Sequence, residues 1–356
     1  MTNAGDDRTE ALLEAVREAL ARRDPLVIRG SGSKDFYGRR YTGTPLEVAG
    51  HRGIVAYEAT ELVLTARAGT PLAEIESVLA NHGQMLPFEP PHFGLHATLG
   101  GTIACGLSGP RRPFSGAVRD AVLGVRLITG HGELLAMGGQ VIKNVAGFDV
   151  PRLMVGALGT LAVILEISLK VLPRPETERS MVLAADPPKA LARMQELLRQ
   201  PWPLSGLAYD HGRLLVRLAG ADAAVAAAAK QIGGEGLAEQ EDYWNALKEQ
   251  RLAFFHQESP LWRFVVPPAH PHPADCGDSV IDWGGGLRWV RSTDSAARLF
   301  ALSRHAGGHA CLFRGGDDVE PRFQPLPSPL LGLHQRIKQA FDPYRIFNRG
   351  RLYAEL

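Results

Sequence analysis

Two tracts of small residues, one at positions 30–33 (Gly-Ser-Gly-Ser) and one at positions 98–109, constrain this chain more than any other feature. The first follows the apolar run 26–28, which predicts a short buried strand. Only small residues allow backbone N–H groups to come within hydrogen-bonding distance of a diphosphate. Two such tracts, each beside a predicted strand and separated by a predicted helix, therefore indicate a site for the diphosphate of a dinucleotide.

The common nucleotide-binding motifs do not fit these tracts. A P-loop requires GxxxxGK[ST], which the sequence lacks, and a Rossmann fingerprint requires GxGxxG with an acidic residue about 20 positions later. Gly30 and Gly32 are followed by Asp35 where the third glycine would be needed. The pair Gly100 and Gly101 begins in a predicted loop, with no strand directly before it. The diphosphate site therefore belongs to another kind of fold.

The first half of the chain is predicted to consist of strands and helices, and Pro173 and Pro175 mark its end. Alternation of apolar and polar residues predicts strands, and an apolar stripe of period 3.6 predicts helices. Thr70 is expected to cap a helix that has Pro71 in its first turn. The glycine-rich stretch 87–119 reads as a long functional loop. The other expected elements are a helix at 8–22, strands at 26–28, 53–69, 121–129, 134–137 and 159–171, and a short helix at 149–157.

The second half, roughly residues 179–325, alternates between strand and helix patterns in the manner of a split βαβ sheet. A last helix is expected at 329–341, stopped by Asp342 and Pro343. These patterns predict three parts: residues 1–175, 176–327 and 328–356. The elements expected in the second half are strands at 181–184, 204–209, 214–218, 281–283, 287–290 and 310–313, and helices at 188–199, 221–232 and 295–305.

The small-residue tracts resemble those of the vanillyl-alcohol-oxidase (PCMH-type) FAD-binding family. Residues 28–33 (IRGSGS) are similar to its first diphosphate loop, and residues 98–109 (TLGGTIACGLSG) to its second flavin loop. Residues 143–149 (KNVAGFD) with 156–164 (GALGTLAVI) resemble the segment that closes on the flavin. Residues 66–75, 83–91, 281–286 and the tail 341–343 narrow the resemblance to the FAD-binding subunits of bacterial glycolate oxidases.

The resemblance implies an α+β fold. Its parts are a PCMH-type FAD-binding domain of two subdomains, a ferredoxin-like α/β cap domain, and a C-terminal helix that returns to the FAD domain. Family members with covalent flavin carry a histidine directly after the second glycine of the first loop. Ser33 stands there, so we expect non-covalent FAD. The expected cofactor-binding residues are Arg29, Gly30, Ser31, Gly32, Ser33, Pro87, Thr98, Gly100, Gly101, Thr102, Cys105, Gly106, Ser108, Gly109, Lys143, Asn144, Gly159, Ala162 and Ile164.

The resemblance further implies a complex that oxidises glycolate or a related 2-hydroxy acid to the keto acid. Its other members are a catalytic flavoprotein subunit and an iron–sulfur subunit. The chain has three cysteines, too few for an iron–sulfur cluster of its own, which normally needs four thiolates. Two alternatives stay open: an autonomous FAD-dependent 2-hydroxy-acid dehydrogenase, and a non-catalytic subunit that binds FAD only to stabilise an assembly.

No catalytic residue and no metal site can be assigned from the sequence. His270 and His272 lie in a proline-rich loop without a nearby carboxylate, which favours a structural role. His92 and His96 lead into the second flavin tract, where either a flavin contact or solvation is consistent with the pattern. Arg111 and Arg112 can neutralise a carboxylate or a phosphate, or lie on the surface as solvated charges.

Charge and hydropathy exclude several classes of partner. The formal net charge is +1, with 39 basic and 38 acidic residues, so no basic field points to nucleic acid. The polar first residues lack the apolar core of a secretory signal, and no run is long enough to span a bilayer. We therefore expect a cytoplasmic protein that associates with a membrane only through partner subunits.

Overall fold

The computed structural model describes residues 6–139, 148–271, 278–316 and 321–356. The chain folds into two compact units. The first unit comprises Met1–Leu107, Ala117–Pro173 and Pro325–Leu356, and the second comprises Ser108–Gly116 and Arg174–Gln324. Within the described residues, no helix is both long and apolar enough to cross a bilayer.

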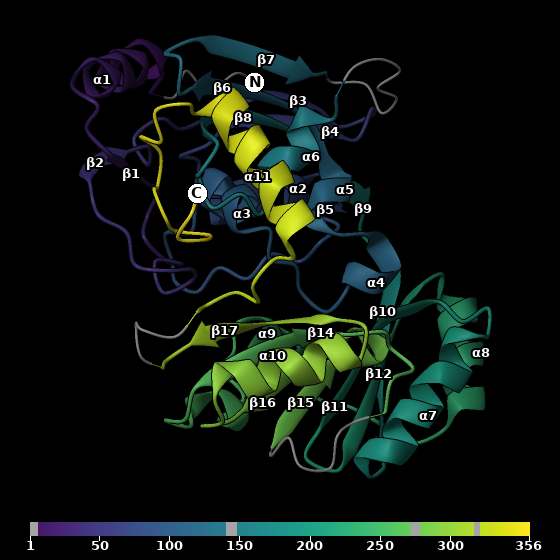
Figure 1. The fold of residues 1–356 in the computed structure, drawn as a ribbon. Coiled ribbons are helices and arrows are strands. Elements are labelled where there is room, and N and C mark those ends of the chain that lie inside the picture. The colour runs from purple at the N-terminus through teal and green to yellow at the C-terminus, as the bar shows by residue number, and fades with distance from the viewer. Residues whose placement is uncertain (1–5, 140–147, 272–277, 317–320) are drawn as a thin grey trace. The chain divides into compact units, whose positions relative to one another are not determined.

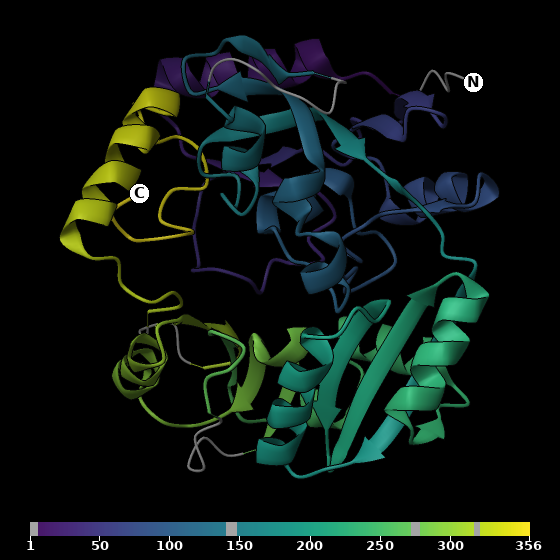
Figure 2. The same ribbon diagram turned by 90° about the vertical axis from the view of Figure 1, so that its right-hand side faces the viewer.

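The first unit is built around a five-stranded antiparallel sheet of order β3-β4-β8-β6-β7 (Figures 1 and 2). A parallel pair, β1 and β2, and a short pair, β5 and β9, accompany it. The strands are β1 (Leu26–Arg29), β2 (Thr44–Glu47), β3 (Ile54–Glu58), β4 (Val63–Arg67), β5 (Gln84–Met85), β6 (Val122–Thr129), β7 (Leu134–Gly138), β8 (Ala162–Lys170) and β9 (Leu172–Pro173). The helices are α1 (Thr9–Arg22), α2 (Leu72–Asn81), α3 (Leu99–Cys105), α4 (Arg112–Ser115), α5 (Val118–Ala121), α6 (Val150–Met154) and α11 (Ser328–Phe341), of which α4 groups with the second unit.

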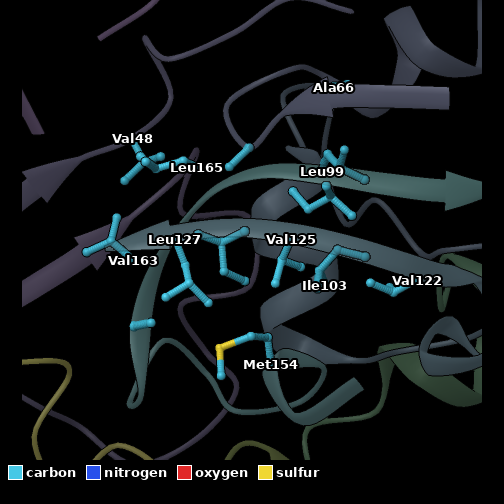
Figure 3. Close-up of a cluster of buried hydrophobic side chains, with 14 of the residues drawn as sticks. Val48, Ala66, Leu99, Ile103, Val122, Val125, Leu127, Met154, Val163 and Leu165 are labelled. Atoms are coloured by element: carbon cyan, nitrogen blue, oxygen red, sulfur yellow. The ribbon is translucent and has the colours of Figure 1, made fainter. Parts of the chain in front are cut away.

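One hydrophobic cluster joins the sheet of the first unit to its helices. Strand β8 is buried along almost its whole length, as expected for a central strand with both faces covered. Figure 3 shows Leu99 and Ile103 of α3 among side chains from the central strands, including Leu127 of β6 and Leu165 of β8. This packing fixes α3, and with it the second small-residue tract, against the sheet.

The second unit has an eight-stranded antiparallel sheet of order β13-β10-β12-β11-β15-β16-β14-β17. The strands are β10 (Thr177–Ala184), β11 (Leu204–Asp210), β12 (Arg213–Gly220), β13 (Glu235–Gly236), β14 (Leu261–Val265), β15 (Ser279–Asp282), β16 (Leu287–Arg291) and β17 (His309–Arg314). The helices are α7 (Pro187–Leu198), α8 (Asp222–Ile232), α9 (Gln240–Lys248) and α10 (Ala296–His305), with 3₁₀ turns η1 (Ala253–His256) and η2 (Trp283–Gly285).

The eight-stranded sheet consists of two halves with the same strand order. Numbered along the chain, β10 to β13 lie in the order 4-1-3-2, and their βαββαβ connections are those of a ferredoxin-like unit. Strands β14 to β17 have the same order, 4-1-3-2, when they are read from the opposite edge of the sheet, and the two halves meet where β11 pairs with β15. The predicted α+β fold with a ferredoxin-like part is therefore confirmed, although the repeat was not visible in the sequence.

Three local predictions were wrong in detail. Residues 53–69 form two strands, β3 and β4, because the chain turns at residues 59–62. Thr70 does not cap α2, since its hydroxyl hydrogen-bonds instead with the N–H and the carbonyl of Gly53. The stretch 87–119 contains three short helices, α3, α4 and α5, where the sequence suggested an irregular loop.

Candidate functional site: a pocket lined by two small-residue tracts

The first small-residue tract forms the loop that leaves β1. Gly32 has φ +77, the left-handed conformation that glycine adopts without strain. In the part of the chain that the structure describes, the N–H groups of Gly30, Ser31 and Gly32 donate to no protein acceptor. Three neighbouring N–H groups without an internal partner form a suitable site for an anion, because half-buried donors need an acceptor from elsewhere.

The second tract forms the start of α3. Thr98 is the N-cap residue, and its hydroxyl accepts a hydrogen bond from the Gly101 N–H at 3.3 Å. The N–H of Gly100 donates to the carbonyl of Ala68 at 2.7 Å, which fixes the start of the helix against the end of β4. Both tracts line one pocket, so the two regions expected to meet around a dinucleotide do lie together.

The C-terminal tail completes this pocket. Asn348 accepts a hydrogen bond from the Ile28 N–H at 2.7 Å, and its amide nitrogen donates to the Leu158 carbonyl at 2.7 Å. One side chain thus joins β1 to the loop before β8. Arg351, also in the pocket wall, lies over the ring of Tyr41 with its guanidinium carbon 4.7 Å from the ring centroid.

The pocket carries a positive charge surplus. Three basic side chains line it, Arg29, Lys34 and Arg351, against one acidic side chain, Asp35, which leaves a formal surplus of two positive charges. Arg29 and Asp35 form an ion pair at 3.1 Å. Lys34 is buried, and its ammonium donates to the His92 carbonyl at 3.1 Å. A diphosphate with two negative charges would balance this surplus.

The size of the pocket matches part of a dinucleotide. Its volume is about 70 Å³, and a single water needs roughly 10–15 Å³ on the same measure. The space therefore suits a diphosphate group, whereas a complete FAD extends well beyond it. The free N–H groups, the small residues and the positive charge all fit the diphosphate part of FAD.

Most of the residues expected to bind the cofactor line this pocket. They are Arg29, Gly30, Ser31, Gly32, Ser33, Thr98, Gly100, Gly101, Cys105, Gly159, Ala162 and Ile164. Cys105 is buried, and burial raises the pKa of its thiol, which keeps it protonated. The sequence reasoning missed Lys34, Asn348 and Arg351. For the last two, the available signal was the glycine that stands between them in the tail, at position 350.

The remaining expected residues lie elsewhere. Pro87 and Thr102 are buried in the first unit outside the pocket wall, and Gly106 ends α3 with φ +64. Ser108 and Gly109 belong to the second unit. Lys143 and Asn144 lie outside the described residues. Their contribution to cofactor binding stays a prediction.

His92 and Arg111, two of the residues with open roles, have partners in the structure. His92 forms a pair with Glu76 at 3.1 Å, and His96 is exposed. Arg111 is buried and donates a hydrogen bond to the carboxylate of Glu178, so the alternative that it lies on the surface as a solvated charge is wrong. His270 is described but His272 is not, and no group of metal-ligating side chains occurs among the described residues.

The second unit places two arginines on one tryptophan. The guanidinium carbon of Arg112 lies 4.2 Å from the ring centroid of Trp283, and that of Arg263 lies 5.2 Å from the same centroid. Trp283 is buried, and its indole N–H donates to the Gly109 carbonyl at 2.9 Å. No carboxylate of the described chain forms an ion pair with Arg263. This corner of the second unit can therefore accept a carboxylate.

Comparisons with known proteins agree with the interpretation of this pocket as part of an FAD site. A protein family described as "FAD binding domain" matches residues 7–138. Glycolate oxidase subunit GlcE of Escherichia coli K12 is 51% identical over 350 residues, which cover 98% of this chain and 99% of that protein. Glycolate oxidase subunit GlcD of Bacillus subtilis is 31% identical over 162 residues, 45% of this chain and 34% of GlcD. The solved structure of an alkyldihydroxyacetonephosphate synthase superposes with a TM-score of 0.67 over 96% of this chain and 75% of that chain, at 14% identity, and shows the shared fold.

Proposed function

The chain belongs to the family of glycolate oxidase GlcE subunits, and from this membership we propose that it is the FAD-binding subunit of a glycolate-oxidising complex. The complex removes two electrons and two protons from glycolate, or a related 2-hydroxy acid, and yields the 2-keto acid. The complex also contains a catalytic flavoprotein subunit, and the electrons leave through a partner iron–sulfur subunit. We place the complex in the cytoplasm, with any attachment to a membrane made by the partners.

The observation that carries this proposal is the pocket between the two small-residue tracts. The unpaired N–H groups of residues 30–32 hold the diphosphate, and Lys34 and Arg351 balance its charge. FAD, when bound, supplies the hydride-accepting chemistry, and the protein supplies its position and electrostatic surroundings. Ser33 offers no side chain for a covalent bond of the kind that histidine forms, so the cofactor is held without one.

The experiment is purification of the tagged chain with its partners from the native host, followed by counts of flavin and iron. We expect FAD on this chain, a second flavoprotein, and iron in a third subunit. The matched variant is Gly32→Asp, which puts a negative charge beside the diphosphate. Loss of FAD and of glycolate oxidation together, in a complex that still assembles, supports an electron-carrying role. If oxidation survives in an assembled complex that has lost this FAD, the flavin only stabilises the assembly. A wild-type chain that binds no FAD after reconstitution would refute the proposal.

One observation favours a second candidate function, an autonomous 2-hydroxy-acid dehydrogenase. Arg112 and Arg263 on Trp283 are suited to hold the carboxylate of a substrate acid. The isolated, FAD-loaded chain would then lose its flavin absorbance when glycolate or D-lactate is added without oxygen, and Arg263→Met would abolish that change. If bleaching requires the partner flavoprotein, the chain is not autonomous.

A further inference from the structure

Helix α11 carries an apolar stripe, and the core of the first unit covers only the C-terminal half of this stripe. Leu330, Leu333, His334, Ile337 and Phe341 recur at the spacing that places side chains on one face of a helix. Ile337 and Phe341, in the C-terminal half, pack against the core. Leu330 and Leu333, in the N-terminal half, are 41% and 43% exposed. Figures 1 and 2 both show α11, in yellow, on the outside of its unit.

A pocket opens beside this stripe. Its volume is about 260 Å³, and its walls come from α6, the loop that follows α6, α11 and the C-terminal tail. The larger apolar lining residues are Leu153, Val155, Leu161, Ile337, Leu352 and Leu356. An apolar cavity of about 150 Å³ is large enough to bind benzene, so this one has room for the side chain of a leucine or a phenylalanine.

The surface around α11 is basic. In the segment 328–356, Arg336, Arg345 and Arg349 are exposed, whereas Glu355 is its one exposed acidic residue. The exposed charges of this segment thus sum to a formal surplus of two, whereas the whole chain carries a formal net charge of +1. Tyr344, which is 51% exposed, adds an aromatic ring to the same segment. An apolar centre with a charged rim is the usual composition of a protein–protein interface.

We propose that this α11 groove, made of the exposed stripe (Leu330, Leu333), the neighbouring pocket and the basic rim (Arg336, Arg345, Arg349), is the surface on which a partner subunit of the complex docks. The partner presents a leucine or phenylalanine to the pocket and acidic residues to the rim. This inference rests on the proposed function, because it requires that the chain assembles with other subunits.

Two other occupants fit the groove less well. A second copy of this chain in a symmetric dimer would bring the same basic rim against itself, and like charges across an interface repel. A small ligand would fill the pocket but leave Leu330 and Leu333 in water. A partner chain with apolar and acidic residues satisfies the stripe, the pocket and the rim together.

The test compares two leucine variants of the full-length tagged chain, each purified with its partners from the host. Leu333→Asp changes the groove, and Leu198→Asp, at a position 39% exposed at the end of α7, is the matched control. We expect Leu333→Asp to lower the co-purified partner at least tenfold while the FAD content stays unchanged, and Leu198→Asp to lower neither. Arg336→Glu with Arg349→Glu should weaken assembly in the same way. Assembly of Leu333→Asp at wild-type stoichiometry would overturn the inference.

A photo-crosslinking residue at position 330 identifies the occupant directly. The expected adduct joins this chain to a peptide of a partner subunit that contains leucine or phenylalanine next to acidic residues. An adduct to a second copy of this chain would overturn the inference. The wild-type chain is therefore tested before any variant. If it co-purifies with no partner at all, the proposed function itself fails.

Discussion

Gly30 lies so close to Thr98 that a β-carbon at position 30 would be 2.5 Å from the hydroxyl oxygen of Thr98. Real β-carbons almost never come within 3.0 Å of another heavy atom. The two small-residue tracts therefore meet at a close contact, where a side chain at position 30 would force the N-cap hydroxyl of Thr98 to shift. This contact explains why position 30 is glycine, in addition to its place in the wall of the proposed diphosphate site.

The first prediction is that Gly30→Ala weakens FAD binding by separating the two tracts. A forced contact of this kind typically costs about 1–3 kcal/mol, so we expect roughly 5- to 150-fold weaker affinity. The control is a double-mutant cycle with Thr98→Ala, which removes the hydroxyl that the new β-carbon would meet. Gly30→Ala should cost less in the Thr98→Ala background, as measured by titration of FAD fluorescence. If the two substitutions have additive effects on FAD affinity in the double variant, residues 30 and 98 do not interact and the prediction is wrong.

The second prediction concerns the charge balance of the pocket. Lys34→Met removes one of the positive charges that line the proposed diphosphate site, so the affinity for FAD should fall about tenfold and depend less steeply on salt. Lys34→Arg should restore most of the affinity, and Arg349→Met, an exposed arginine outside the pocket, should have no effect. Equilibrium dialysis at several salt concentrations measures both quantities. Unchanged affinity in Lys34→Met would mean that the ammonium serves only its contacts within the protein, such as the hydrogen bond to the His92 carbonyl.

The residues that the sequence identified and those it missed differ in a physical way. Gly30, Gly32 and Gly101 are visible because the need for glycine is local to a turn or a close approach. Asn348 and Arg351 reach the same pocket only through folding of the distant tail, which no local pattern reports. Helix α3 was missed because its glycines have low helix propensity, and packing of Leu99 and Ile103 against the sheet decides the conformation.

The fold of the second unit was predictable in kind but not in its repeat. The helices α7, α8 and α10 carry clear apolar stripes and were expected within a few residues of their bounds. Helix α9 and strand β14 were not expected. The second half of the sheet has no helix between β14 and β15 in the described residues, so its sequence does not repeat the alternation of the first half.

The third prediction is a pH dependence from His51, which is fully buried. Burial lowers the pKa of this imidazole below 6.5, and although Asp7 raises it and Arg67 lowers it further, burial has the larger effect. At a pH between the folded-state pKa and 6.5, the imidazole of His51 therefore binds a proton in the unfolded chain but not in the folded chain. Stability is therefore complete above about pH 6.5 and decreases as the pH falls toward the folded-state pKa.

The substitution that tests this dependence is His51→Asn. It keeps an acceptor for the Arg8 N–H, which lies 3.0 Å from Nδ1, and removes the titrating group. The free energy of unfolding, measured by urea titration between about pH 7 and pH 5, should fall less steeply in this variant than in the wild type. The exposed His82→Asn serves as the control and should follow the wild-type curve. Equal slopes in all three proteins would contradict the assignment to His51.

A buried ion pair holds the C-terminal tail against the first unit. Lys338 and Asp342 lie one helical turn apart at 2.7 Å, and both side chains are almost inaccessible to solvent. The ammonium also donates to the carbonyls of Thr160 and Phe347, at 2.6 and 3.1 Å. The carboxylate accepts from the N–H groups of Ile346 and Phe347. The pair thus shapes the turn after α11 and places Phe347 and Asn348 next to β1.

The fourth prediction is that Lys338→Met destabilises the protein by about 3–5 kcal/mol, because it leaves the Asp342 carboxylate buried without its cation. The double variant Lys338→Met with Asp342→Asn should recover part of this loss, since the amide removes the buried charge and its oxygen keeps an acceptor for one of the two N–H groups of Ile346 and Phe347. Urea unfolding measures the stability. Because Asn348 follows this turn and joins β1 to the loop before β8, the single variant should also bind FAD more weakly than the double variant. If the single variant loses stability but binds FAD as the wild type does at a temperature where both are folded, the tail does not hold the cofactor pocket in shape.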